Sequence, residues 1–288
     1  MKPAPFEYHA PETVADVVDV LAAHGDDAKP LAGGQSLVPM LSLRLARFEH
    51  LVDLNRVTEL TSVERREGGV VVGAMTRQAV LERPGPADDV PLLGQAAPLI
   101  GHFQIRNRGT VGGSVAHADP ASELPAVTLA LDAELHVAAP AGPRVVPAAE
   151  FFVGNWTTVL DADELLTAIA FPVWEGRCGS AVEEVARRHG DFALTGTACA
   201  VSVDTADRIE RCAVALFGMD STPVRARGAE AALIGRAGDE AELVEAAQLA
   251  VRDLDPPDDV HASARYRRSV GAHVVQRGLT RALAAARR

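Results

Sequence analysis

The fold of this chain is decided by a glycine-paired stretch, Ile105-Arg106-Asn107-Arg108-Gly109-Thr110-Val111-Gly112-Gly113-Ser114, which continues to His117-Ala118-Asp119-Pro120. Gly112 and Gly113 lack a Cβ, so we expect positive φ at both and a close approach to a ligand. The hydroxyls of Thr110 and Ser114 flank the pair, and several backbone N–H groups are expected to point into one concavity. Such a nest favours a phosphate or pyrophosphate. We call residues 105–114 the second glycine loop.

An earlier stretch repeats this pattern and is called here the first glycine loop, residues 31–39: Leu31-Ala32-Gly33-Gly34-Gln35-Ser36-Leu37-Val38-Pro39. A single glycine pair is typical of ordinary turns. Two pairs, each following a short apolar run and closing with Ser, indicate a shared dinucleotide site, with two unrelated turns as the alternative. The GxGxxG pattern of Rossmann domains is absent from the sequence.

Composition limits the possible classes of protein. The chain has 288 residues, 48% of them hydrophobic, which is enough for two domains and a sizeable core. Its net charge of -11 argues against general nucleic-acid binding. We expect neither a membrane span nor a secretory signal, because no long apolar run occurs and the N-terminal residues lack an apolar h-region. Three scattered cysteines predict reduced, buried thiols in a cytoplasm, and cannot ligate an iron–sulfur cluster.

Periodicity predicts a β-α-β-like unit first. A helix begins after Thr13 and stops at Gly25, between strands at 28–32 and 50–54, with a brief helix at 36–45. The pattern of apolar residues predicts further strands at 63–74 around a Gly68-Gly69 turn, and at 133–138, 144–147 and 165–171. Asp119 is predicted to cap a helix with Pro120 at its first position.

A boundary is predicted near 172–180, where Pro and Gly accumulate and the pattern changes. Beyond it we expect an antiparallel sheet followed by helices. The predicted strands are 198–203 and 211–217, and the predicted helices are 226–233, 240–251 and 264–285.

Three ordered motifs resemble the FAD-binding medium subunits of the molybdenum hydroxylases, a family that includes aerobic carbon monoxide dehydrogenase and xanthine dehydrogenase. The first is Ala32-Gly33-Gly34-Gln35-Ser36 with Leu43-Arg44-Leu45 and Leu51-Val52-Asp53-Leu54-Asn55-Arg56. The second is Thr110-Val111-Gly112-Gly113-Ser114 with His117-Ala118-Asp119-Pro120 and Glu123-Leu124-Pro125. The third is Ala186-Arg187-Arg188-His189-Gly190-Asp191-Phe192-Ala193. The resemblance covers essentially the whole chain.

The resemblance implies an α+β fold. A two-lobed α/β FAD-binding domain of the PCMH or vanillyl-alcohol-oxidase-like type would span residues 1–175, with lobes at about 1–55 and 56–175. A C-terminal flavoprotein domain, residues 176–288, would consist of an antiparallel sheet with helices. FAD would lie extended in the cleft between the lobes, with its pyrophosphate held by both glycine loops.

The resemblance also implies a set of cofactor-binding residues: Ala32, Gly33, Gly34, Gln35, Ser36, Leu37, Thr110, Val111, Gly112, Gly113, Ser114, His117, Asp119, Glu123, Leu165, Leu166, Asp191 and Phe192. Glu123 would accept hydrogen bonds from ribityl or ribose hydroxyls, Leu165 and Leu166 would lie by the pyrimidine edge, and Phe192 near the isoalloxazine ring. Two residues depart from the family: Gln35 replaces a frequent His, and Glu183 replaces a Lys of xanthine dehydrogenase-like members.

The sequence supports metal binding and nucleophilic catalysis by these residues less well than cofactor binding. His117, Asp119 and Glu123 are possible metal ligands, but Asp119 is better explained as a helix cap, so we predict no metal. Ser36 and Ser114 lie in no GxSxG elbow, and we predict no catalytic residue. Arg106 and Arg108 either face solvent or brace the second glycine loop.

By resemblance, the chain is an electron-transfer subunit that receives electrons from a 2Fe-2S small subunit beside a molybdopterin-binding large subunit, in a cytoplasmic dimer of heterotrimers. NAD, quinone or oxygen would be the final acceptor, and the sequence names neither this acceptor nor the substrate. Two alternatives stay open. One is a free-standing FAD-dependent oxidase or dehydrogenase, and the other is a flavin-free structural subunit that bridges partners.

Overall fold

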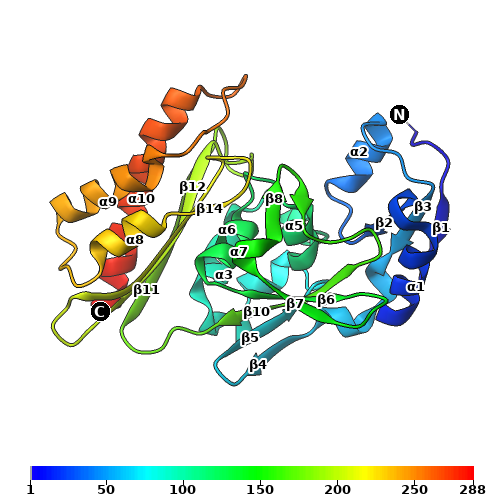
Figure 1. The fold of residues 1–288 in the computed structure, drawn as a ribbon, viewed down its shortest axis with the longest axis horizontal. Coiled ribbons are helices and arrows are strands. Elements are labelled where there is room, and N and C mark those ends of the chain that lie inside the picture. The colour runs from blue at the N-terminus through cyan, green and yellow to red at the C-terminus, as the bar shows by residue number, and fades with distance from the viewer. Residues whose placement is uncertain (1) are drawn as a thin grey trace.

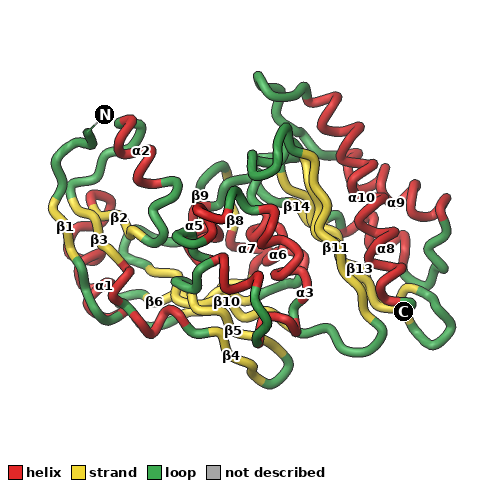
Figure 2. The backbone as a smooth tube through the Cα atoms, turned by 180° about the vertical axis from the view of Figure 1, so that it is seen from behind, coloured by secondary structure: helices red, strands yellow, loops and turns green. Residues whose placement is uncertain are grey.

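The computed structural model describes residues 2–288 and arranges them as three parts in a row, with the N-terminal lobe at one end and the C-terminal helices at the other (Figure 1, Figure 2). We call these parts the first lobe (β1 to β3), the second lobe (β4 to β10) and the C-terminal part (β11 to α10). No helix among residues 2–288 combines the length and apolar character that a membrane span needs. The fold is mixed α and β, as the sequence predicts.

The first lobe is a parallel sheet in the order β1-β3-β2 with helices beside it. Its elements are β1 (Glu7–His9), α1 (Val14–His24), β2 (Ala28–Leu31), α2 (Leu37–Leu43) and β3 (His50–Asp53). As predicted, α1 begins after Thr13, whose hydroxyl accepts a hydrogen bond from the N–H of Asp16, and it ends at Gly25 with φ 52°. Its apolar positions recur at helical spacing and are buried against the sheet: Val17, Val18 and Leu21.

The second lobe is built on a five-stranded antiparallel sheet in the order β4-β5-β10-β6-β7. Its strands are β4 (Val63–Arg66), β5 (Gly69–Gly73), β6 (Glu134–Ala138), β7 (Arg144–Pro147) and β10 (Leu165–Pro172), with a small hairpin of β8 (Phe152–Gly154) and β9 (Thr157–Thr158). Its helices are α3 (Pro91–Ala96), α4 (Phe103–Arg106), α5 (Val111–His117), α6 (Glu123–Ala130) and α7 (Ala148–Phe151). Every residue of α6 is buried, which makes this helix the centre of the lobe.

The C-terminal part is a four-stranded antiparallel sheet covered by helices, as predicted. Its elements are β11 (Cys178–Val185), β12 (Thr195–Val203), β13 (Ile209–Phe217), β14 (Val224–Arg225), α8 (Arg227–Leu233), α9 (Glu240–Arg252) and α10 (Ala264–Ala286). All nine residues of β12 are buried, because α10 packs against this strand and α6 of the second lobe also contacts it. Strand β12 is therefore covered on both faces, and the sheet joins the two parts.

One helix start differs from its prediction. Asp119 does not cap α6: the helix begins at Glu123 and its N-cap residue is Ser122. The Asp119 carboxylate instead accepts a hydrogen bond from the N–H of Ala121, at 2.9 Å, which forms a turn before the helix. Sequence spacing cannot separate these two uses of an Asp-Pro pair, because both place an acceptor two residues before a free N–H.

Candidate functional site

The first glycine loop presents a row of free backbone donors. It follows β2, turns at Gly34 with φ 72°, and enters α2 at Leu37. Within residues 2–288, none of the backbone N–H groups from Gly33 to Leu37 donates a hydrogen bond. The side-chain amide of Gln35 donates to the Gly33 carbonyl at 2.9 Å and fixes the turn. Consecutive N–H groups with no internal acceptor form a ready site for an anion.

The second glycine loop differs from its prediction. Gly112 and Gly113 lie in the first turn of α5 and have no positive φ. Thr110 is the N-cap, and its hydroxyl accepts from the N–H of Gly113 at 3.0 Å. The remaining N–H groups of the turn donate within the chain, from Val111 to Thr76, from Gly112 to Ala74 and from Ser114 to Thr110. The prediction of free N–H groups here was wrong, because a helix cap and neighbouring carbonyls use them.

Close packing explains the glycines of the second loop. A Cβ on Gly112 would lie 2.4 Å from the Cβ of Ala74, at the end of β5. A Cβ on Gly113 would lie 2.5 Å from the Thr110 hydroxyl oxygen and 3.2 Å from the Cβ of Ala32. At these positions glycine is needed because neighbouring segments pack too closely for a side chain, and not because the backbone has a positive φ.

The two glycine loops contact each other. A Cβ on Gly33 would lie 2.4 Å from the Arg108 carbonyl oxygen and 2.7 Å from the Cα of Gly109. Ala32 packs beside Gly113 in the same way. The structure therefore brings the first and second motifs together, as a shared site requires.

A polar bridge that the sequence reasoning missed holds the loops in place. The Asn55 side-chain amide donates to the Ala32 carbonyl at 3.3 Å, and Arg77 donates to the Asn55 side-chain oxygen at 2.5 Å. Arg77 also donates to the Arg108 carbonyl. Burial, and then the charge of Arg108, lowers the pKa of Arg77 below its ordinary value. Asn55 lies in the first motif and was a detectable signal, whereas Arg77 lies in no motif.

Arg106 braces the second loop from behind. It is 7% exposed, pairs with the Glu82 carboxylate, and donates to the carbonyls of Ile100 and Gly101 at 3.1 and 3.0 Å. Of the two roles left open for the arginines, Arg106 has the bracing one. Arg108 contributes its carbonyl to the bridge above while its side chain is exposed.

Two carboxyl groups, the buried Glu123 and the half-buried Glu184, lie where α6 meets the C-terminal sheet. Glu123 is 6% exposed, and burial followed by the nearby Glu184 charge raises its pKa to about 8. Burial raises the pKa of Glu184 on β11 to about 7. One oxygen of Glu184 (Oε2) is buried without a hydrogen-bond partner in residues 2–288. Such a pair favours a polar neighbour that supplies the missing hydrogen bonds.

A cavity of about 1210 Å³ joins the end of the second motif to the third. Asp119, Trp156, Arg187, Asp191 and Phe192 are among its lining residues. Phe192 and Trp156 are 65% and 62% exposed, and the Trp156 indole donates to the Asp119 carboxylate at 3.2 Å. Two exposed aromatic rings beside a cavity of this size favour a large planar ligand.

The other predicted site residues have mixed environments. His117 ends α5, and burial lowers its pKa. Leu165 and Leu166 begin β10 with their side chains buried in two separate hydrophobic clusters, so only their backbone is available to a ligand. Glu183 is 3% exposed and pairs with Arg277 and Arg281 of α10. The residue of β11 that approaches Glu123 is therefore Glu184, not Glu183.

Comparison with known families gives two adjoining matches. Residues 4–174 match the model described as the FAD binding domain in molybdopterin dehydrogenase. Residues 180–282 match the CO dehydrogenase flavoprotein C-terminal domain.

Individual relatives are similar in sequence over nearly the full length of both chains. The alpha subunit of the 6-hydroxypseudooxynicotine dehydrogenase complex of Paenarthrobacter nicotinovorans is 41% identical, with 100% of this chain and 97% of the relative covered. The carbon monoxide dehydrogenase medium chain of Hydrogenophaga pseudoflava is 38% identical, with 99% of each covered. A solved structure of carbon monoxide dehydrogenase from Hydrogenophaga pseudoflava, lacking the Mo-pyranopterin moiety, matches with a TM-score of 0.96 at 39% identity and 99% coverage of both chains. The chain thus belongs to the FAD-binding medium subunits of the molybdenum hydroxylase family.

Proposed function

We propose that FAD is held with its pyrophosphate on the first glycine loop and its ring system at the cavity beside Phe192. Three observations support this placement. The N–H groups from Gly33 to Leu37 are free within the described chain, Glu184 has an orphaned buried oxygen, and the cavity is flanked by two exposed aromatic rings. An extended dinucleotide suits a site whose polar groups are spread over two lobes.

The two glycine loops have different roles in this proposal. The first loop supplies backbone donors to the phosphates, since its N–H groups lack internal acceptors. The second loop uses its own N–H groups and the buried Thr110 hydroxyl internally and positions the first loop, with the half-buried Ser114 hydroxyl at its edge. The residues predicted from the sequence are retained as the cofactor-contacting set, with Asn55 and Arg77 added as positioning residues.

Glu123 supplies the hydrogen-bonding group deepest in the site. Its raised pKa keeps the carboxyl protonated near neutral pH, so it both donates and accepts. A protonated acid suits ribityl or ribose hydroxyls, and it adds no negative charge beside a pyrophosphate.

We further propose that the chain accepts electrons from a 2Fe-2S small subunit and passes them to an external acceptor, in a cytoplasmic complex that also contains a molybdopterin-binding large subunit and is assembled as a dimer of heterotrimers. FAD supplies the two-electron chemistry when it is bound. This chain's three cysteines, Cys178, Cys199 and Cys212, are free thiols on the C-terminal sheet and do not form a cluster site. We retain 1–175 and 176–288 as the two domains, with lobes at about 1–55 and 56–175.

The observation that carries the proposal is the row of free N–H groups against a second loop that packs on it. The test is to purify the chain alone and with its two proposed partner subunits, and to release the cofactor with acid for chromatography. We expect FAD in both preparations, dye reduction by the lone chain with a chemical reductant, and substrate-dependent dye reduction only in the complex. Release of FMN, or a colourless chain that does not bind added FAD, would overturn the cofactor assignment. Oxidation of an organic substrate by the lone chain at more than about 1 turnover per second would favour a free-standing enzyme.

A further inference from the structure

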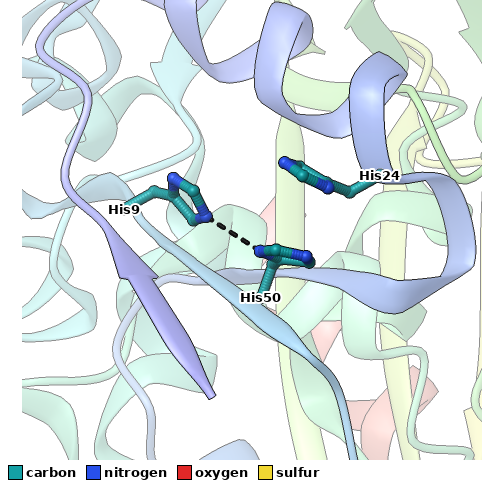
Figure 3. Close-up of side chains that lie close together, drawn as sticks. All are labelled: His9, His24 and His50. Atoms are coloured by element: carbon teal, nitrogen blue, oxygen red, sulfur yellow. Dashed lines mark hydrogen bonds between the residues drawn. The ribbon is translucent and has the colours of Figure 1, made fainter.

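Three histidines from three elements of the first lobe converge on one point. His9 ends β1, His24 ends α1 and His50 begins β3 (Figure 3). The rings of His24 and His50 are stacked with centroids 3.6 Å apart, and the His9 ring lies 5.2 Å from His50 and 5.6 Å from His24. One ring nitrogen from each histidine lies within 4.8 Å of the other two.

A carboxylate faces the same point. Glu7 lies beside His50 in the parallel pairing of β1 and β3. Its two oxygens lie 3.9 Å from Nε2 of His9 and 3.6 Å from Nδ1 of His50. These two nitrogens are themselves 3.0 Å apart and share a hydrogen bond. We call Glu7, His9, His24 and His50 the histidine cluster.

The cluster is separate from the proposed cofactor site. His50 pairs with Ala28 at the start of β2, whereas the first glycine loop follows Leu31 at the end of that strand. His50 and Glu7 therefore lie at the opposite end of the strands from the loop, and His9 lies two residues further along β1. Its members belong to none of the loops and cavity walls described above.

Packing alone does not account for these imidazoles. The His9 and His50 side chains are only 20% and 14% exposed, yet one shared hydrogen bond is all that joins them. The ring of His24 makes no hydrogen bond with any residue of 2–288. Three half-buried imidazoles whose ring nitrogens lie within 4.8 Å of one another, beside the exposed Glu7 carboxylate, offer the donor types that zinc takes in proteins.

We propose that the histidine cluster binds one Zn²⁺ ion through Nε2 of His9, Nδ1 of His50 and a ring nitrogen of His24, with the Glu7 carboxylate as the fourth ligand. Tetrahedral zinc–nitrogen bonds of about 2.0–2.1 Å require the His24 ring to rotate out of its stack on His50, because stacked rings do not direct their in-plane nitrogen lone pairs at one point. The ion replaces the hydrogen bond between His9 and His50, so the histidine that donates this bond takes the other tautomer, with its proton on its other ring nitrogen. The bound ion cross-links the three-residue edge strand β1 to the end of α1 and the start of β3.

The test uses the full-length, FAD-loaded chain without a histidine tag, first stripped with a chelator. We expect one equivalent of Zn²⁺ to bind in competition with a chromophoric chelator, and Co²⁺ to give the intense visible absorption of a tetrahedral site. We also expect Zn²⁺ to raise the thermal midpoint without changing FAD content. Absence of stoichiometric Zn²⁺ binding would overturn the proposal.

Variants assign the ligands. His50→Gln and His24→Gln should each weaken Zn²⁺ binding by more than about 100-fold, since loss even of an outer-shell partner costs about 10–100-fold. His24 ends a helix and is the safer variant for folding, and retained FAD content checks this for both. His273→Gln, at an exposed position of α10, is the matched control and should bind Zn²⁺ as the unaltered chain does. Equal affinity in His24→Gln and His273→Gln would refute the assigned ligand set.

Discussion

A Cβ on Gly33 would lie 2.4 Å from the carbonyl oxygen of Arg108, so the two glycine loops meet where no side chain fits. The nearest atoms, the Arg108 carbonyl oxygen and the Gly109 Cα, belong to the backbone, so they cannot move aside as a flexible side chain would. The contact sets the position of the free N–H groups that follow Gly33. It links the first motif to the second more directly than either motif's own pattern suggests.

Gly33→Ala should therefore force the two loops apart and weaken FAD binding by at least about tenfold, which corresponds to about 1.4 kcal/mol. The measurement is fluorescence titration of the FAD-free chain with FAD. Gly228→Ala is the matched control, because nothing lies within 4 Å of a Cβ at that helical position. Equal FAD affinity in Gly33→Ala and the unaltered chain would contradict the role of this contact.

Arg77→Lys should weaken FAD binding while keeping the positive charge. The planar guanidinium reaches Asn55 and the Arg108 carbonyl at once, and a lysine ammonium lacks that fork. Losing one charge-assisted hydrogen bond costs about 1.5–3 kcal/mol. We expect lower thermal stability and at least fivefold weaker FAD binding, roughly 1 kcal/mol. Arg83→Lys, at an exposed position, serves as the control, and similar losses in both variants would indicate a general charge effect.

Glu184→Gln should flatten the dependence of stability on pH. Burial raises the pKa of Glu184 from 4.5 to about 7, so the folded chain holds this proton more tightly than the unfolded chain. The resulting stability is complete below the unfolded pKa and is lost as pH rises through the folded pKa. Glutamine cannot ionise, so the variant escapes this loss.

We expect the Glu184→Gln variant to equal the unaltered chain near pH 4.5 and to be more stable by about 1–3 kcal/mol above pH 8, after allowance for partial exposure. Denaturant unfolding of the FAD-free chain at several pH values measures this difference. Glu245→Gln, at an exposed site of α9, should show no such gain. A Glu184→Gln curve parallel to that of the unaltered chain would count against a buried, protonated carboxyl.

Local patterns were sufficient for most of the fold. The capping hydroxyl of Thr13 and the stop at Gly25 place α1 correctly, because both act within a few residues of the helix ends. Two long strands of the C-terminal sheet, β12 and β13, were also predicted, although the strand β11 was missed and β12 begins at Thr195, before the predicted start. Its first residues are a threonine and a glycine, whose burial comes from α6 and α10 rather than from their own character.

The site was harder to predict because its contacts join distant segments. The glycines at 112 and 113 marked the right place for the wrong reason, since a clash with Ala74 is invisible in the sequence. Arg77 and the histidine cluster could not be found from spacing, because their partners lie on separate elements. Glu183 and Glu184 alternate across a strand, and only the packing of α10 shows which of the two faces away from Glu123.

Phe192→Ala should alter the bound flavin without altering the fold. The Phe192 side chain is 65% exposed beside the cavity, so its removal leaves no cavity in the core. Unfolding of the FAD-free chain should change by no more than about 0.5 kcal/mol, as for ordinary surface substitutions. If the ring of Phe192 covers the flavin, its loss should shift the visible absorption of the bound FAD and its accessibility to a collisional quencher. Phe103→Ala is the control, because Phe103 is similarly exposed at 63% and does not line the cavity. If the flavin spectrum and quenching of Phe192→Ala match those of the unaltered chain, the ring system lies elsewhere. If Phe103→Ala shows the same change as Phe192→Ala, the effect is not local to the cavity.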